Sequence, residues 1–559
     1  MYFTGILSTI TFIPLVGALI IMAFPKGQKK AVAYFATLVA GVDFLVSLPL
    51  FFASPEGAPG LFSGWGAFNF VEDVSWIPSI GARYIFGIDG ISGLMILLTT
   101  LLGLIAVLSS WSAITDRVKE YYVFLLLLQT GMLGVFCALD FFLFYVFWEV
   151  MLVPMYFLIG IWGGTRRLYA TIKFFLYTLA GSVLMLLGIL AIYFYAGQNT
   201  FDLRILAPAL AGDTSVVWTE IAWWVFLTFF IGFAIKVPMV PFHTWLPDAH
   251  TEAPTAGSVI LAGVLLKMGT YGFVRFSLPI MPATAWVFAE FLLWLSVIGI
   301  IYGALVAMAQ KDWKKLIAYS SVSHLGFVML GIFAFNQVGI NGGLLQMVNH
   351  GLSTGALFLI VGIIYERRHT RLLADYGGLS KVMPVFAVMF MIFTLSSIGM
   401  PALNGFIGEF TILAGAFQIA PALGGKIFAI LGATGIVLGA AYMLWLYQRT
   451  MFGKLDNPDN ENLKDLNLRE WVYLTPLVIL CFWIGLYPKP FFAMLEPATA
   501  RLTMVLEQHR PAEFAWDGEV TAMEAMNLDE AGQVAETPEA APAAVTASKP
   551  EMLSAGGRP

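Results

Sequence analysis

Residues 230–254 read FIGFAIKVPMVPFHTWLPDAHTEAP, an apolar run that carries Lys236 and is then interrupted by Pro238, Pro241 and Pro247. Proline removes a backbone donor and clashes with the preceding helical turn, so a helix breaks here. Inside a membrane such a break is tolerated only where the freed backbone groups meet water or polar partners. Transporters place ion sites at breaks of this kind, and we therefore predict a functional site around Lys236.

The composition of the whole chain indicates a membrane protein. Of 559 residues, 59% are apolar and only 12% are charged, whereas an ordinary soluble domain has about 25% charged residues. This excludes a soluble enzyme or a disordered scaffold as an interpretation of the whole chain, and the net charge of −5 offers no basic surface for nucleic acid. Cys137 and Cys481 sit in separate apolar runs, which gives neither a disulfide framework nor a cysteine metal site.

Fourteen apolar stretches are long enough to cross a bilayer, which takes about 20 residues each. None alternates as a barrel strand does, so we expect an all-α membrane protein in which the first stretch is a helix and not a cleaved signal. The spans lie near 3–24, 31–53, 90–110, 119–139, 141–163, 171–196, 220–242, 255–278, 285–309, 316–336, 339–365, 382–403 (continued after a break by 405–420), 427–450 and 470–493.

Lys and Arg residues in the connecting loops predict the orientation. The loops after odd-numbered spans carry nineteen of them, and the loops after even-numbered spans carry four: Arg83, Arg204, Arg275 and Lys426. Positive loops stay on the cytoplasmic side. We therefore expect a multi-pass membrane protein with both termini outside. The family resemblance described below implies that the membrane is a bacterial cytoplasmic (inner) membrane, so that both termini are on the periplasmic side.

Seven acidic, basic or histidine side chains lie deep within the spans, away from the span ends, where a charge costs about 2.5–3.5 kcal/mol or more. They are Asp43, Glu149, Lys236, Lys267, His324, His350 and Glu409. Glu149 would be ionised only with a cation nearby, so Lys236 is its expected partner, and a purely structural pair is the alternative. Lys267 lies in a glycine-rich span suited to close helix packing. Asp43 is best explained by helix contact alone.

The two histidines each lie on a polar stripe of their helix. His324 follows two serines by one turn, and His350 has Gln346 and Thr354 one turn away on either side. Positions three or four apart share a helix face. One buried histidine is more often a hydrogen-bonded packing residue, but two on such stripes favour a water-lined proton path.

Glu409 marks a second broken helix with a buried charge. Residues 394–413, TLSSIGMPALNGFIGEFTIL, place Pro401, Asn404 and two glycines just before it. The two breaks fall in spans 7 and 12, and this odd spacing implies opposite orientation in the membrane. We therefore predict two inverted five-helix repeats, spans 4–8 and 9–13, each with a broken helix, as in secondary transporters.

These repeats suggest a division of the chain into five parts. They are N-terminal helices in 1–118, a first repeat in 119–280, a second repeat in 281–452, a last helix in 453–495 and a tail in 496–559. The family resemblance described next implies that the first is the proton-input repeat and the second the proton-output repeat. Residues 511–559 are rich in alanine and acids, cannot bury much apolar area, and are expected to stay disordered.

Three segments resemble the proton-translocating antiporter-like family: KVPMVPFHTWLPDAHTEAPT (236–255), QKDWKKLIAYSSVSHLGF (310–327) and QMVNHGLSTGALFLIVG (346–362). The family comprises the three large membrane subunits of respiratory complex I and related subunits of Mrp cation/proton antiporters and membrane-bound hydrogenases. The resemblance covers roughly residues 80–490. The glutamate at 409, where two of the three complex I subunits have a lysine, favours the third.

The resemblance implies roles for these residues. Glu149 and Lys236 would form the ion pair of the input half, Lys267 would lead to the centre, His324 and His350 would continue the row, and Glu409 would end it. His243 lies in the same motif and is a further candidate. The resemblance also implies that this chain binds no metal or cofactor, because FMN, iron–sulfur clusters and quinone belong to other subunits. The expected partners are the other complex I membrane subunits, especially the two other antiporter-like chains, and membrane lipid.

The expected mechanism is electrostatic. While Glu149 is close, Lys236 is held protonated; when the two separate, the proton moves to Lys267 and onward to Glu409. Two alternatives remain: an Mrp-type sodium/proton antiporter or membrane-hydrogenase subunit, which would share most motifs, and a non-conducting scaffold whose charges only hold helices together.

Overall fold

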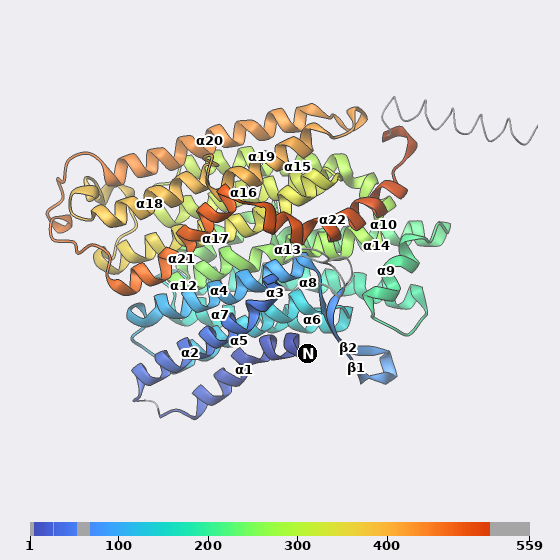
Figure 1. The fold of residues 1–559 in the computed structure, drawn as a ribbon, viewed down its shortest axis with the longest axis horizontal. Helices are drawn as coiled ribbons and strands as arrows, with labels where there is room; N and C mark the ends of the chain where they lie inside the picture. The colour runs from blue at the N-terminus through green and yellow to red at the C-terminus, as the bar shows by residue number, and fades with distance from the viewer. Residues whose placement is uncertain (1–4, 26, 53–67, 515–559) are drawn as a thin grey trace, which may run out of the picture. The chain divides into compact units, whose positions relative to one another are not determined.

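The structure is a computed structural model that describes residues 5–25, 27–52 and 68–514 (Figure 1). Within these ranges, thirteen helical stretches are long and apolar enough to cross a membrane. They are α1 (Ile6–Ala23), α2 (Lys29–Ser47) with α3 (Pro49–Phe52), α4 (Gly90–Ala113), α5 (Val118–Cys137), α6 (Phe141–Val150) with α7 (Leu152–Trp162), α8 (Arg167–Ala196), α10 (Val216–Lys236), the stretch Thr255–Ile280, α15 (Pro282–Met308), α16 (Trp313–Phe333), α17 (Gln337–Arg368), α20 (Lys426–Met451) and α21 (Leu468–Leu486).

The fourteenth span is the broken one, formed by α18 (Pro384–Ser397) and α19 (Asn404–Phe417), each of which is too short to cross alone. Every span predicted from the sequence therefore has its helix, and the predicted helical membrane fold is confirmed. The helix order also repeats. Three spans, a broken pair and one further span occur from α5 onward, with α10 and α11 (Trp245–Glu252) as the pair, and again from α15 to α20.

Both breaks satisfy their freed backbone groups internally. The first helix half ends at Lys236, and the indole Nε1 of Trp245 donates a 2.9 Å hydrogen bond to the carbonyl of Ile235. At the second break, the N–H of Met400 donates a 3.0 Å hydrogen bond to the carbonyl of Leu395, in the last turn of α18. A membrane interior requires such partners, because water is not available to replace them.

The span that carries Lys267 is regular only in short pieces. It consists of α12 (Thr255–Ile260), α13 (Leu266–Gly272) and α14 (Leu278–Ile280), joined by the π-helical turns Leu261–Leu265 and Phe273–Ser277. Single π turns inside a helix shift the side chains that follow, and they are frequent at functional sites. Lys267 therefore lies in a seven-residue helical piece with an irregular turn on each side.

The helix α17 forms the centre of the folded unit. The apolar part of this helix is entirely buried, and the helix packs against α16, α19, α12, α4 and α22. In Figure 1 it runs through the middle of the helices, with α1 and α2 at one edge and α20 at the opposite edge. His350 is on this helix, so the centre of the protein is also where the predicted row of ionisable residues passes.

Two elements outside the spans go beyond the sequence-based expectation. An antiparallel hairpin of β1 (Asn69–Ile77) and β2 (Ala82–Ile88) follows α3, and α9 (Leu203–Ala211) lies in the loop after α8. The hairpin has a role in positioning α1, because the Glu72 carboxylate accepts a 2.8 Å hydrogen bond from the backbone N–H of Leu7. An acid suits this place, since the first amides of a helix lack partners.

Helix α22 (Lys489–Gln508) corrects the expected start of the tail at residue 496. The helix continues for twelve residues past that boundary because its apolar face, including Met494, Leu502 and Leu506, is buried against the folded unit. The expected disorder of the later residues cannot be compared with the structure, since 515–559 lie outside the described residues. Residues Ala512–Phe514 form a short 3-10 turn in a separate unit.

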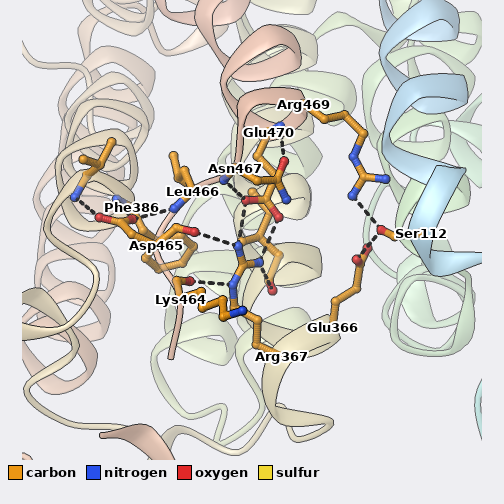
Figure 2. Close-up of polar contacts among 12 residues, drawn as sticks. Ser112, Glu366, Arg367, Phe386, Lys464, Asp465, Leu466, Asn467, Arg469 and Glu470 are labelled. Atoms are coloured by element: carbon orange, nitrogen blue, oxygen red, sulfur yellow. Dashed lines mark hydrogen bonds and ion pairs between the residues drawn. The ribbon is translucent and has the colours of Figure 1, made fainter. Parts of the chain in front are cut away.

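A polar network ties helix ends together on the side that the positive loops assign to the cytoplasm (Figure 2). Arg367, at the end of α17, binds both carboxylate oxygens of Glu470 on α21 at 2.9 and 2.7 Å. The Asp465 carboxylate accepts hydrogen bonds from the backbone N–H groups of Val385 and Phe386 at 2.8 and 2.9 Å, which satisfies the start of α18. The first half of the second broken helix is therefore anchored at its outer end.

Candidate functional site

The structure brings four of the predicted residues into one buried line, here called the row: Lys267, His350, His324 and Glu409. The Nζ of Lys267 lies 2.5 Å from Nδ1 of His350, although the two residues are 83 positions apart in the sequence. The same amine hydrogen-bonds the carbonyl of Ala262, in the π turn just before it. Lys267 is fully buried, so its bonding partners are protein atoms from two helices.

The row continues through the two histidines to the glutamate. The ring centroids of His350 and His324 are 5.8 Å apart, so the two rings are direct neighbours. Nδ1 of His324 lies 3.3 Å from Oε1 of Glu409, and Nε2 of His324 lies 3.1 Å from Oγ of Ser397. Groups that can gain and lose a proton thus follow one another from the first repeat to the second.

Glu409 is held by a dense amide network. Gln346 Nε2 donates to Glu409 Oε1 at 3.3 Å, and Asn349 Nδ2 donates to Gln346 Oε1 at 3.1 Å. A side chain at Gly408 would collide with the Gln346 amide, so the glycine is needed for this approach. Gln346 belongs to the predicted polar stripe around His350. Its amide donates to Glu409 and not to the histidine.

The two serines beside His324 make no hydrogen bond to it in the described part of the chain. Ser320 Oγ and Ser321 Oγ both donate to the carbonyl of Ile317 in their own helix, at 2.8 and 3.2 Å. His324 instead uses Ser397, on the first half of the broken helix. Spacing along one helix identified the polar face but could not show which neighbouring helix supplies the partner.

Glu149 and Lys236 are close enough to interact electrostatically, but among the described residues no ion pair within 4.0 Å joins them. Lys236 is 2% exposed and lies over the ring of Trp148, with its Nζ 5.2 Å from the ring centroid. Glu149 is only half-buried, and its Oε1 has no hydrogen-bond partner in the described part of the chain. The input pair is therefore assembled more loosely than the row.

The helix that carries Lys236 also approaches the span of Lys267 closely. A Cβ at Gly269 would lie 2.7 Å from the carbonyl oxygen of Phe233 and 2.9 Å from the backbone nitrogen of Val237. Only glycine permits this contact, which agrees with the predicted close packing of the glycine-rich span. Lys236 and Lys267 thus lie on two helices in contact, although no direct bond between their side chains is present in the described residues.

Two other predicted or noted residues lie apart from the row. His243 is buried with its ring edge-on to Tyr302, at a centroid distance of 5.2 Å, and interacts electrostatically with Lys173. Asp43 is fully buried in α2 and accepts a 2.6 Å hydrogen bond from Gln129 Nε2. The Asp43 contact joins α2 to α5, as expected for a helix-packing residue.

Two buried residues near the row were not among the predicted site residues. His250 in α11 is 0% exposed, and neither of its ring nitrogens has a hydrogen-bond partner among the described residues. Lys314 on α16 is 6% exposed and donates a 2.6 Å hydrogen bond to the carbonyl of Ala253. Both lie in the quoted motifs, but Lys314 is one of the nineteen loop charges, and nothing in the sequence singled out His250.

Outside the spans, four charged residues form an outer cluster: Asp73, Arg83, Asp202 and Arg204. Burial opposes ionisation of Asp73, but hydrogen bonds and charges from Arg204 and Arg83 outweigh it and hold the pKa of Asp73 below its usual value. Next to the cluster, burial raises the pKa of Asp140 to about 6, against hydrogen bonds from backbone N–H groups. The outer cluster lines a cavity of about 530 Å³.

No group of three His, Cys, Asp or Glu side chains placed to hold a metal ion occurs in the residues that the structure describes. The row is instead a set of single proton-binding groups linked end to end. Its chemistry is the transfer of protons between neighbours, for which positioned donors and acceptors within hydrogen-bond reach or one water apart are the requirement.

Comparisons with known proteins identify the family of the chain. The family model described as NADH:quinone oxidoreductase/Mrp antiporter, TM, matches residues 138–439. NADH-quinone oxidoreductase subunit M of Rhodobacter capsulatus is 46% identical over 511 residues, which are 89% of this chain and 96% of that protein.

Two solved structures share the fold. A chain of respiratory complex I from Thermus thermophilus with bound NADH is 32% identical with a TM-score of 0.79, covering 89% of this chain and 99% of that one. A chain of the Mrp complex from a Dietzia species, at 20% identity and a TM-score of 0.76, covers 91% and 99% respectively and shows the fold alone. The chain therefore belongs to the transmembrane family of NADH:quinone oxidoreductase and Mrp antiporter subunits.

Proposed function

We propose that this chain is the M-type membrane subunit of a respiratory complex I, the counterpart of mitochondrial chain 4, and that it moves protons across a bacterial inner membrane. The observation that carries this proposal is the buried row, in which Lys267, His350, His324 and Glu409 connect the two inverted repeats. Ionisable groups at membrane depth are costly, and four in sequence are best explained by a function that uses them.

In this proposal Glu149 and Lys236 act as the switch of the input half. When the carboxylate is near, it stabilises the ammonium form of Lys236. When the carboxylate moves away, the buried cation loses its counter-charge, and a proton is released towards Lys267. The proton then passes along the histidines to Glu409, and His243 is assigned a supporting place beside the input half.

Electron transfer belongs to other subunits in this proposal. FMN, iron–sulfur clusters and quinone would be bound there, and this chain would hold no cofactor of its own. Its neighbours would be the other complex I membrane subunits, especially the two other antiporter-like chains, together with lipid. A relative named as subunit M at 46% identity supports this assignment over an Mrp antiporter, as does the glutamate at position 409.

The proposal is tested by purifying the tagged chain from its native membrane. It should co-migrate with an assembly that contains flavin and iron–sulfur clusters and oxidises NADH. Sealed vesicles should take up protons during this reaction, and Lys267→Ala should lower the proton yield per NADH. Sodium-dependent proton exchange without NADH oxidation would favour the Mrp-type antiporter. An unchanged proton yield with neutral row residues would favour the scaffold.

Orientation can be tested by cysteine labelling. The two native cysteines are buried, so they give little background. Lys30→Cys lies in a positive loop and Thr214→Cys in a loop of the opposite class, and both positions are exposed. A membrane-impermeant reagent should label Lys30→Cys only from the cytoplasmic side and Thr214→Cys only from the periplasmic side. Labelling of both from one side would contradict the fourteen-span orientation.

A further inference from the structure

The span that carries Lys267 continues towards its far end with two more polar side chains. Tyr271 follows Lys267 by one turn within α13, so the two share a helix face. Arg275, in the π turn Phe273–Ser277, donates a 3.0 Å hydrogen bond from Nε to the hydroxyl of Tyr271. A line of polar groups therefore leads from the row to the end of the span that the loop charges assign to the outside.

The guanidinium of Arg275 is enclosed at this end. One of its terminal nitrogens lies 2.6 Å from Oδ1 of Asp89, and the side chains of Arg275 and Asp89 are 10% and 2% exposed. The guanidinium carbon lies 5.1 Å from the ring centroid of Tyr271 and 5.2 Å from that of Phe68. With an acid and two aromatic rings against it, the guanidinium contacts protein groups on most of its surface and little open water.

Asp89 is itself fixed by the start of α4. Its Oδ1 accepts hydrogen bonds of 3.1 Å from the backbone N–H groups of Ile91 and Ser92, as an N-cap aspartate does. The hydroxyl of Ser92 also lies 3.0 Å from the hydroxyl of Tyr271. The ion pair is therefore built into the junction of two membrane helices, which determine the position of the guanidinium.

The groups in this line differ in whether they can pass on a proton. The hydroxyls of Tyr271 and Ser92 each donate and accept hydrogen bonds, so they can relay a proton. A guanidinium has only donors and does not lose its proton in proteins, so it cannot relay one. Arg501 on α22 interacts electrostatically with both Asp89 and Arg275. Two cations and one acid give this end a net positive charge, which repels protons from the aqueous side.

We propose that Arg275, held by Asp89, is a seal that separates Lys267 from the outer aqueous side and prevents pumped protons from returning to the row. This inference rests on the proposed proton-translocating function and deepens it. A pump raises the proton activity on the outer side, and only about two helical turns separate Lys267 from Arg275. Without the guanidinium, the Tyr271 hydroxyl would connect the lysine to that side. Arg275 takes part in no transfer step of the pump.

The test measures proton leak without turnover. The purified complex is reconstituted in sealed phospholipid vesicles, where added NADH energises only the molecules whose cytoplasmic face is outward. Once the NADH is used up, the decay of the pH gradient is followed, with the membrane potential removed by potassium and valinomycin. Assembly and NADH oxidation are measured in parallel.

Three single variants are compared in this assay. Arg275→Gln removes the charge, and Arg275→Lys keeps the ion pair but introduces a group that can exchange a proton with Asp89. Arg204→Gln is the matched control, because Arg204 is another ion-paired arginine in a loop of the same class.

We expect the gradient to decay at least about tenfold faster in Arg275→Gln than in the parent, because the repelling charge is gone. Arg275→Lys should also decay faster than the parent, and Arg204→Gln should match the parent. Adding Lys267→Ala to Arg275→Gln should restore the slow decay, because the leaking proton then has no acceptor at the start of the row.

Parental decay in Arg275→Gln would overturn the seal. So would a leak in Arg275→Gln that persists when Lys267 is replaced, since disturbed packing would then explain it. Parental decay in Arg275→Lys would overturn the seal as well, whether or not Arg275→Gln assembles, because the ion pair alone would be sufficient. None of these results touches the proposed function, which fails only if Lys267→Ala by itself keeps the parental proton yield per NADH.

Discussion

The two repeats hold their charged residues in different ways. In the second repeat, Glu409 is 2% exposed and is contacted by an imidazole and an amide from two helices. In the first repeat, Glu149 is half-buried, and the described residues supply no direct ion pair to Lys236. Related topologies have therefore produced one preorganised charge and one loosely held pair.

This difference suggests where control enters the protein. A glutamate fixed by its own chain responds to the protonation of its neighbours in the row. A glutamate on a partly open face can respond to whatever packs against that face, because its position is not determined by the chain alone. Val150 and Val153, beside Glu149, are also exposed, so an apolar surface surrounds the carboxylate. The first repeat is thus suited to receive a signal and the second to release a proton.

The largest effect is expected at the preorganised charge. Glu409→Gln keeps the shape and the contact with Gln346 but cannot carry a proton, so proton transport through this chain should fall at least about tenfold. Glu409→Asp should be milder, because it retains the acid. The measurement is NADH-driven proton uptake in sealed vesicles with assembly checked by native gel. Full uptake with the amide variant would return Glu409 to a structural role.

The loosely held pair should show strong coupling instead. Lys236→Ala leaves Glu149 without a counter-charge, and Glu149→Gln leaves Lys236 as an unpaired buried cation. Each change breaks the same cycle, so their losses should not add, as is usual for residues in one ionic network. The double variant should take up protons about as slowly as the worse single variant. Two fully additive losses would show that the residues work independently.

Moving the acid along the helix should have an intermediate effect. In a Glu149→Gln background, a new carboxylate at Val146 or Val153 lies about one turn away. Met151 separates α6 from α7, so Val146 shares the helix of Glu149 and Val153 does not; Val153 is also 50% exposed. We expect partial recovery of proton uptake with Val146→Glu and less with Val153→Glu. No recovery at either position would argue against a through-space switch.

The smallest effect is expected far from both charges, in the outer cluster. The pKa of Asp73 is lowered, so its ion pairs stabilise the protein above the ordinary pKa of about 3.9 and lose their effect as the pH falls below it. Asp73→Asn should cost less than about 1 kcal/mol at pH 7, because the pairs are screened by solvent. The difference from the parent in thermal unfolding should shrink in acid.

The exposed Glu220→Gln serves as the charge-matched control for this change, since it removes one acid from the same side of the chain. It should shift the unfolding temperature less than Asp73→Asn at pH 7. An equal shift for both variants would mean that the ion pairs of the outer cluster add nothing beyond net charge. Proton uptake should be unaffected by either substitution, which separates the outer cluster from the transport function.

The sequence was informative where local chemistry is unusual. Prolines beside Lys236, and the Pro401 to Gly408 interruption before Glu409, predicted both broken helices because proline acts on its own backbone. Distant pairing was not visible in the same way. The contact of Lys267 with His350, and the use of Ser397 by His324, depend on how helices pack, and helix periodicity gives only the face of a residue.

His250 illustrates a second limit of sequence reasoning. In the motif it follows an aspartate and precedes a threonine and a glutamate, so the segment has the composition of a solvated helix end. Only the packing of α11 against α17 shows that the ring of this one residue is buried on Phe358 while its neighbours line a cavity. The hairpin at 69–88 was missed for a similar reason, since β1 has few buried side chains.

The position of α22 has a consequence for how the protein is made. Thr499 donates a 2.7 Å hydrogen bond to Asn341 on α17, and the carbonyl of Met494 lies so close to Gly90 on α4 that no side chain would fit there. A ribosome delivers α4 first, α17 later and α22 after every membrane span. The spans must therefore be inserted before α22 exists. Until then, the surfaces of α4 and α17 that α22 later covers remain uncovered. Quality-control proteases would recognise those uncovered surfaces in a nascent chain stalled before residue 489, so the fold is complete only after α22 has been made.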